Sequence, residues 1–393
     1  MHWIRSGAFT IAVTGAIAMA TATTGTADRA PAPPPLSTPG DTSRIDLVAS
    51  STEDGWRYDQ YRNGAYPCSI SGYQTFTIAT RTGADPRREV PLWTFMHGGG
   101  TGYFQPDGTP TSTQHMTEEP LSRQQGSLRT GALNARIAAS TAEIRLMAVS
   151  MCNRDIYGGF GLDDPNNPNT TPDGRPRYTN GLLATKAAVQ FATTTYPTDD
   201  HFLYGGSAGS YGTFHVAFGL QQQGLAPAGV VADSGVMNTL WQEANRDSPV
   251  CGHSDEWASI FPRRLHPSIT TGTNDPDQIV ASGRLTVPVF DVWTIGDPGQ
   301  CGTTPMTCPS RTGATTRLGS VDCMHEPLRR ALASDPRSHS MRLCVTATGS
   351  NRQCDLHTPT TDQGAVNTLS GEPADFNARI LAWVHERIQD DQD

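Results

Sequence analysis

The sequence predicts an α/β fold with a mostly parallel central sheet and helices on both of its faces. Short apolar runs typical of buried strands alternate with stretches of helical periodicity along the chain. Several of these runs end in glycine-rich turns, and the chain contains no internal repeat. Its 39 glycines and 29 prolines indicate long loops on a compact scaffold rather than disorder.

The individual elements follow from these runs. We expect strands at 92–96, 145–150, 201–204, 229–232, 287–293 and 340–345. We expect helices over 179–195, through Phe214 and Phe218, and over 376–388. The stretch Val236–Gly283 has no clear period, and we interpret it as an insertion that caps the site.

The N-terminus is typical of a secretory signal peptide, which we place at 1–27. Arg5 precedes an apolar run, and small residues allow cleavage after Ala22 or Ala27. The run is too short and too rich in small residues to anchor the protein stably in a membrane. A Pro-rich spacer is expected at 28–44, because proline disfavours helix and sheet, and a catalytic domain at 45–393. The sequence therefore predicts a secreted protein.

Charge and cysteine content exclude some classes of function. The net charge is −9, from 29 basic and 38 acidic residues, so nucleic acid is not an expected partner. The eight cysteines are scattered and form no Cys-x-x-Cys pair, a pattern that favours disulfides over a zinc site. We expect short disulfide loops at Cys301–Cys308 and Cys344–Cys354, and a monomeric protein.

The strongest motif is Gly205-Gly206-Ser207-Ala208-Gly209. A G-x-S-x-G sequence alone is weak evidence in a glycine-rich chain, so its context matters. Here an apolar strand precedes the motif and a helix of small residues follows it. This context predicts the nucleophile elbow of the α/β-hydrolase fold, with Ser207 exposed at a sharp strand-to-helix turn.

A second motif, His97-Gly98-Gly99-Gly100, follows an earlier strand. Acyl transfer creates an oxyanion that needs preorganised donors, and glycine N–H groups can approach it closely. We expect the oxyanion hole to consist of the N–H groups of Gly99, Gly100 and Ala208. For His97 we favour a role in bracing the loop over a catalytic one.

The general base should be a histidine in a loop after the last strand, and His357 satisfies this expectation. The other candidates occupy less suitable places, before a helix, before the last strand and on the C-terminal helix: His325, His339 and His385.

The orienting carboxylate should follow the strand 287–293, which selects Asp297 and preserves the chain order Ser, Asp, His. Asp233, at the end of the preceding strand, is the main rival. Asp291 lies within a strand, and we expect it to pair structurally.

Three further segments carry a family resemblance. Cys152-Asn153-Arg154-Asp155-Ile156-Tyr157-Gly158-Gly159 resembles the cysteine-led loop of the pectinacetylesterase-like (Notum-like) family. The stretch from 178 through the elbow, and Asp233-Ser234-Gly235 after the next strand, are similar to that family as well. Two features depart from it: Gly100-Thr101 replaces a usual Gly-Trp, and Asn153-Arg154 stands where plant members usually have glycine. The resemblance implies ester hydrolysis, often removal of acetyl groups from a polysaccharide.

These observations together predict a serine carboxylic-ester hydrolase that needs no metal or organic cofactor. The expected substrate is a small-molecule or polysaccharide ester with a short acyl group. The alternatives are a lipase, a polyester depolymerase or a peptidase, and, from a different class, an inactive binding protein with a hydrolase fold. The charged residues of Val236–Gly283 argue against the apolar cap of a lipase.

The aromatic loop residues have two interpretations. They could stack on sugar rings, or they could pack within the loops: Tyr103, Phe104, Tyr157 and Phe160.

Overall fold

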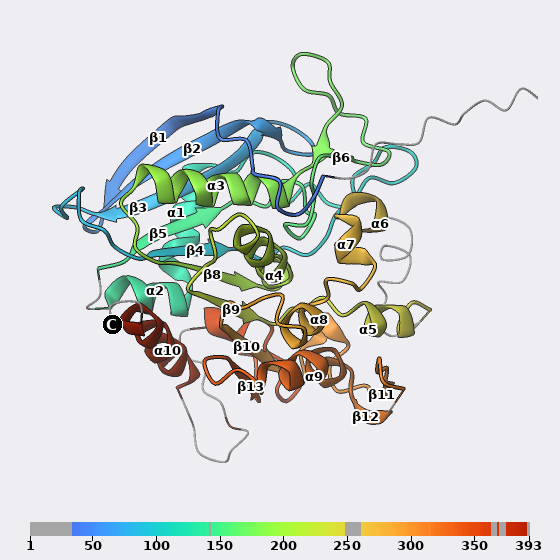
Figure 1. Cartoon of the computed structure of the whole chain (residues 1–393). Helices are drawn as coiled ribbons and strands as arrows, with labels where there is room; N and C mark the ends of the chain where they lie inside the picture. The colour runs from blue at the N-terminus through green and yellow to red at the C-terminus, as the bar shows by residue number, and fades with distance from the viewer. Residues whose placement is uncertain are drawn as a thin grey trace, which may run out of the picture. The chain divides into compact units, whose positions relative to one another are not determined.

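A mixed β-sheet forms the centre of the computed structural model, which describes residues 34–140, 143–247, 261–313, 315–362, 368 and 375–390 (Figure 1). Within these residues its strand order is β1-β2-β3-β5-β4-β8-β9-β10-β13. The strands are β1 (Ile45–Glu53), β2 (Trp56–Pro67), β3 (Tyr73–Arg81), β4 (Leu92–Met96), β5 (Arg145–Val149), β8 (His201–Gly206), β9 (Gly229–Asp233), β10 (Val289–Thr294) and β13 (His339–Leu343). The strands from β5 to β13 in this order pair in parallel, whereas β1, β2 and β3 pair antiparallel.

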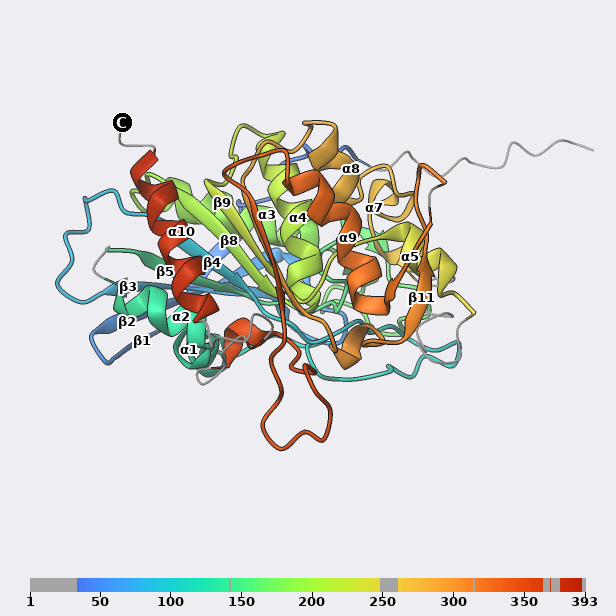
Figure 2. The same cartoon turned by 90° about the horizontal axis from the view of Figure 1, so that it is seen from below.

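Helices cover both faces of this sheet (Figures 1 and 2). Those of the described residues are α1 (Leu121–Thr130), α2 (Ala132–Ala139), α3 (Gly181–Thr195), α4 (Ala208–Gln221), α5 (Thr239–Ala244), α6 (Phe261–Arg264), α7 (Pro267–Thr270), α8 (Pro276–Ala281), α9 (Ser320–Leu332) and α10 (Phe376–Asp390). Two short hairpins lie outside the sheet: β6 (Leu162–Asp163) with β7 (Tyr178–Thr179), and β11 (Pro305–Cys308) with β12 (Thr316–Gly319).

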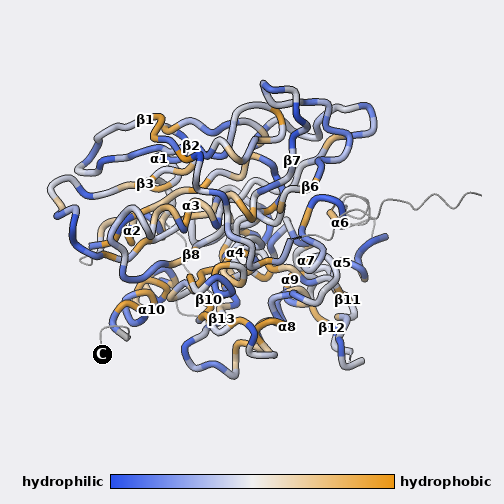
Figure 3. The backbone as a smooth tube through the Cα atoms, turned by 45° about the horizontal axis from the view of Figure 1, so that its top comes forward, coloured by the Kyte–Doolittle hydropathy of each residue, from blue (hydrophilic) through white to orange (hydrophobic). Residues whose placement is uncertain are grey.

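Alternation along the strands divides the core into two layers, because successive side chains of a strand point to opposite faces. Leu203 of β8 packs in the layer of α3, α4, α8 and α9, whereas its neighbours Phe202 and Tyr204 pack in the layer of α1, α2 and α10. In Figure 3 the apolar stretches gather around the central sheet and its helices, and the outer loops are largely hydrophilic. The predicted α/β-hydrolase fold, with a mostly parallel sheet and helices on both faces, is confirmed.

The expected elements agree with the structure to within a few residues, but the antiparallel strands β1 to β3 were not predicted. The compact unit begins at Pro34, and the predicted signal peptide at 1–27 lies outside the described residues. Leu36 is buried, and the Lys186 ammonium of α3 donates to the carbonyl oxygens of Leu36 and Thr38. The last part of the predicted spacer therefore packs against α3.

The disulfides partly match expectation. Cys344–Cys354 is present as predicted. The expected Cys301–Cys308 bond is wrong, because Cys308 at the end of β11 pairs with Cys323 in α9, at a Cα–Cα distance of 5.2 Å. Cys301 is disulfide-bonded as well.

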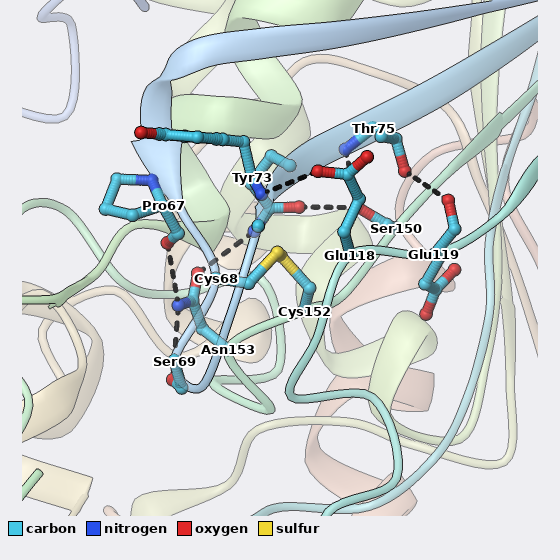
Figure 4. The surroundings of a disulfide bond; sticks show 12 residues. Pro67, Cys68, Ser69, Tyr73, Thr75, Glu118, Glu119, Ser150, Cys152 and Asn153 are labelled. Carbon is cyan, nitrogen blue, oxygen red and sulfur yellow. Dashed lines mark hydrogen bonds between the residues drawn. A yellow bond between two sulfur atoms is a disulfide. The ribbon is translucent and has the colours of Figure 1, made fainter. Parts of the chain in front are cut away.

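A further bond, Cys68–Cys152, closes a sequence separation of 84 residues and ties the end of β2 to the loop after β5 (Figure 4). In the chain-entropy model a loop of that length stabilises the fold by about 4 to 5 kcal/mol.

Candidate active site

Ser207 lies at the sharp turn between β8 and α4, as the motif predicts. Its φ of 53° and ψ of −120° are unusual for a residue with a side chain, and such strain is typical of a nucleophile elbow. Neighbouring glycines make the turn feasible: a Cβ on Gly209 would lie 1.8 Å from the carbonyl oxygen of Met96. The Ser207 N–H donates to the carbonyl oxygen of Asp233 at 2.8 Å, which fixes the elbow against β9. The N-terminus of α4 begins at the next residue and favours negative charge there.

His357 and Asp297 form a hydrogen-bonded pair. The distance between Nδ1 of His357 and Oδ2 of Asp297 is 2.7 Å, and the carboxylate is fully buried, whereas the imidazole side chain is 37% exposed. Asp297 is itself held by the N–H of Gly299, at 2.9 Å. Burial alone would lower the pKa of His357, but the hydrogen bond and charge of Asp297, with the charge of Asp233, raise it above its usual value. The pair has the arrangement of a general base and the carboxylate that orients it.

Asp233, the rival carboxylate, contacts the histidine loop rather than the histidine ring. One carboxylate oxygen accepts from the N–H and the hydroxyl of Thr360, and the other from the Ser234 hydroxyl at 2.8 Å. Ser234 in turn accepts from the N–H of Thr358 at 3.1 Å. Burial raises the pKa of Asp233 to about 6, although these donors and the charge of His357 lower it. Asp233 is therefore a buried support for the loop that carries His357.

The glycines expected to form the oxyanion hole lie beside the serine. Gly98, Gly99 and Gly100 line the same cavity as Ser207, Ala208 and His357. A Cβ on Gly98 would lie 2.9 Å from the Cβ of Ser207, so only glycine allows this approach. Gly99 and Gly100 have φ values of +145° and +66°.

The cavity that joins these residues measures about 520 Å³, within the usual size range of small-molecule sites. Its apolar wall consists of Phe95, Ile156, Tyr211 and Trp241. Trp241 belongs to α5, in the stretch that was interpreted as a cap, and its indole N–H donates to the carbonyl oxygen of Ser320 at 3.1 Å. The described part of that stretch thus contributes a fixed aromatic wall to the site.

The remaining candidate residues have structural surroundings. His325 lies inside α9, with its Nδ1 3.1 Å from Oδ2 of Asp291 and its ring stacked on Trp293 at 4.6 Å. Asp291 therefore pairs structurally, as expected. His339 is in β13 and packs edge-on against Phe290, and His385 is on α10.

Three of the four loop aromatics pack within the protein, whereas Tyr103 is half-buried. Phe104, Tyr157 and Phe160 are buried, with exposed fractions of 3% or less. These three rings are not available for stacking on a sugar.

Beneath the glycine loop lies a buried cluster that sequence reasoning missed. Ligand atoms of His97, His115 and Glu119 lie within 4.8 Å of one another, a spacing that could in principle hold a metal ion. Arg123, however, donates to Nε2 of His115 at 3.1 Å, so the proton of that ring is on Nδ1, which lies 2.8 Å from Glu119. A protonated nitrogen cannot be a ligand. The donor arrangement fits a hydrogen-bonded ion pair and does not fit a metal.

In that cluster His97 carries the positive charge. Its Nδ1 donates to the Gly98 carbonyl oxygen at 2.6 Å, and its Nε2 faces a carboxylate oxygen of Glu119 at 3.0 Å. Burial lowers the pKa of His97, but the charge and hydrogen bond of Glu119 and the Gly98 carbonyl outweigh it and raise the pKa. His97 thus braces the glycine loop, as favoured from the sequence. In the sequence, the only sign of this cluster was the i, i+4 spacing of His115 and Glu119. Such a spacing usually indicates a pair on one face of a helix, but these two residues lie in a loop.

Comparisons with known proteins give only distant structural similarities. No family model and no curated protein matches the chain, so its resemblance to pectinacetylesterase-like enzymes stays a prediction. Among solved structures, an esterase from Rhizomucor miehei is 14% identical, with 91% of this chain and 87% of that chain covered and a TM-score of 0.46. An S-formylglutathione hydrolase from Agrobacterium tumefaciens is 10% identical, with 76% and 89% covered and a TM-score of 0.44. The chain spans 50% of the length of a thermostable esterase, with 68% of this chain covered, 14% identity and a TM-score of 0.34.

Among the residues that the structure describes, no helix has the length and apolar character needed to cross a membrane.

Proposed function

We propose that this protein is a serine carboxylic-ester hydrolase in which Ser207 is the nucleophile, His357 the general base and Asp297 the orienting carboxylate. The observation that carries the proposal is the 2.7 Å bond between His357 and Asp297, on a histidine that lines the same cavity as the strained Ser207. Ser207 follows β8, Asp297 lies in the loop after β10 and His357 lies in the long loop after β13. All three therefore lie beyond the carboxyl ends of parallel strands, where open α/β sheets bind ligands.

The reaction would proceed through an acyl-enzyme. His357 takes the hydroxyl proton as Ser207 Oγ attacks the ester carbonyl, and Asp297 stabilises the imidazolium that forms. The N–H groups of Gly99, Gly100 and Ala208 bind the oxyanion. His357 then gives its proton to the leaving alcohol, and water, activated by the same histidine, releases the acid.

We infer a short acyl group as the preferred substrate feature. Trp241, Tyr211 and Phe95 form bulky apolar walls of the cavity beside Ser207 and leave limited room for a long acyl chain. An acetyl ester of a sugar or polysaccharide combines a short acyl group with a polar alcohol. The family resemblance points to the same substrate class, and secretion through the predicted signal peptide would bring the enzyme to such a substrate.

The test is hydrolysis of nitrophenyl acetate, butyrate and octanoate by the purified protein and by Ser207→Ala. We expect the wild type to prefer acetate, and Ser207→Ala to lose activity by about 10⁶-fold. Ser334→Ala, which removes an exposed hydroxyl at the end of α9, is the matched control and should retain full activity. Equal rates for Ser207→Ala and wild type would reject the nucleophile.

A substrate panel then separates the alternatives. Release of acetate from acetylated polysaccharides supports the proposed substrate. Preference for octanoate or for a polyester film supports a lipase or depolymerase, and cleavage of peptide amides supports a peptidase. Absence of turnover, together with no labelling of Ser207 by a fluorophosphonate, supports a binding protein.

A further inference from the structure

Two carbonyl groups of the glycine loop are each held by a cationic side chain. The His97 ring donates to the carbonyl oxygen of Gly98, and an Nη2–H of Arg154 donates to the carbonyl oxygen of Gly99. The two side chains come from different elements. His97 follows β4, and Arg154 belongs to the loop after β5, close to the Cys68–Cys152 bond.

Peptide geometry links these contacts to the oxyanion donors. The peptide unit with the Gly98 carbonyl also carries the N–H of Gly99, and the unit with the Gly99 carbonyl carries the N–H of Gly100. In a planar trans peptide the N–H points opposite to the carbonyl. A side chain that fixes one of these carbonyls therefore also fixes the direction of the N–H on the opposite side of the same peptide unit.

We propose that His97 and Arg154 are positioning residues that orient the N–H groups of Gly99 and Gly100 toward the oxyanion, a proposal that rests on the serine-esterase function above. Glycine rotates more freely than other residues, so a glycine loop alone would populate several peptide orientations. An oxyanion hole accelerates the reaction only when its donors are already aligned in the ground state. His97 and Arg154 hold the carbonyl oxygens of the two peptide units, and the N–H groups on the opposite sides of these units are thereby aligned.

The support beneath each cation is rigid. His97 is paired with Glu119, whose carboxylate is almost completely buried and whose backbone carbonyl accepts from the Thr75 hydroxyl at 3.1 Å (Figure 4). Since both ring nitrogens of His97 contact acceptors, the ring is held in its doubly protonated form.

Arg154 has a matching support. Its backbone has a φ of 50°, and the neighbouring Asn153 side chain donates to the carbonyl oxygen of Pro67 and to the Ser69 hydroxyl, each at 3.2 Å (Figure 4). Its stem packs on Gly102, where a Cβ would lie only 2.7 Å from the Arg154 Cδ. The glycine at 102 leaves room for the arginine beside the oxyanion loop.

The experiment compares Arg154→Met, which keeps the stem and removes the donors, with Arg154→Lys, which keeps a donor and the charge. Each variant is assayed for kcat and KM on nitrophenyl acetate, and for inhibition by a trifluoromethyl ketone that forms a tetrahedral adduct with Ser207. We expect Arg154→Met to lower kcat by about 10- to 100-fold with KM nearly unchanged, and to weaken inhibition by the same factor. Arg154→Lys should recover most of both.

Matched variants exclude a merely structural effect. Arg177→Met removes a guanidinium that donates to the carbonyl oxygens of Cys68 and Gly72, away from the glycine loop. It should lower the melting temperature without changing kcat or the inhibition constant. His97→Phe should reproduce the loss of kcat and of inhibition.

The outcomes are distinguishable. The proposal is overturned if Arg154→Met lowers the melting temperature but keeps wild-type kcat and inhibition, or if it raises KM at constant kcat, which would indicate substrate binding. A fully active Ser207→Ala enzyme would reject the underlying esterase function instead, whatever Arg154 does.

Discussion

The Oδ2 atom of Asp297 lies 2.7 Å from Nδ1 of His357, whereas the Asp233 carboxylate accepts from Thr360, in the loop that follows this histidine, and from the Ser234 hydroxyl. Two buried carboxylates therefore support the proposed base in different ways. Asp297 fixes the tautomer of the ring, and Asp233 fixes the backbone and hydroxyl groups beside it.

The first prediction separates these two roles. Asp297→Asn should lower kcat by on the order of 10⁴-fold, because an amide favours the wrong tautomer of the histidine. Asp233→Asn should cost much less, about 10-fold, because it disturbs only the support of the loop. Steady-state kinetics on nitrophenyl acetate measure both. If Asp233→Asn were the more damaging change, Asp233 would be the triad acid.

A second prediction concerns the acid limb of the pH profile. The base must be neutral, and the pKa of His357 is raised, so kcat/KM should fall as the pH drops through a value above the usual histidine pKa of about 6.5. The charged groups that act on this ring are Asp297 and Asp233. Asp233→Asn removes one negative charge and should move the acid limb to lower pH. If the acid limb of the Asp233→Asn profile stayed at the wild-type pH, the charge of Asp233 would not raise the pKa of His357.

A third prediction tests the ion pair below the oxyanion loop. Glu119→Gln leaves the buried cation of His97 without its partner and should destabilise the protein by about 3 kcal/mol at pH 6, measured by urea unfolding. Because the pKa of His97 is raised in the folded state, the contribution of this pair is complete below about pH 6.5 and is lost as the pH rises through the raised value. The difference from wild type should therefore narrow at pH 9.

The neighbouring Glu118 provides the control for that measurement. Its ion pair with Arg62 is partly exposed, with side-chain exposures of 25% and 43%. Glu118→Gln should cost about 1 kcal/mol or less. Equal costs for the two variants would contradict a special role for the Glu119 pair.

A fourth prediction addresses acyl-chain length. Trp241→Ala removes an aromatic wall of the cavity and should raise the ratio of kcat/KM for octanoate over acetate by about 10-fold or more. Trp241→Phe, which leaves most of the wall in place, should give an intermediate ratio. An unchanged ratio in both variants would place the acyl group elsewhere in the cavity.

Much of this site could be predicted because its signals are local. The glycines around Ser207 are required by one tight turn, and a search of the loops that follow successive strands led to Asp297 and His357. The supporting residues gave no such signal. Glu119 meets His97, and Arg154 meets Gly99, only through contacts between distant segments.

Contacts between distant segments also explain why some elements of the fold were not predicted. Strand β2 carries buried polar side chains, such as Gln60, which donates to the carbonyl oxygen of Glu119 at 3.0 Å. Polar residues at buried positions obscure the alternation by which a strand is usually predicted. Similarly, the proline-rich stretch was expected to be a solvated spacer, and its packing depends on Lys186, far along the chain.

The Cys68–Cys152 bond links the proposed activity to the redox state of two cysteines. It ties the Arg154 loop to residues 69–71, which pair in turn with the segment leading to Glu119. Both cations behind the oxyanion loop are thus secured by one covalent link that forms only under oxidising conditions. If the proposed function is correct, reduction of this bond should therefore weaken ester hydrolysis as well as lower stability.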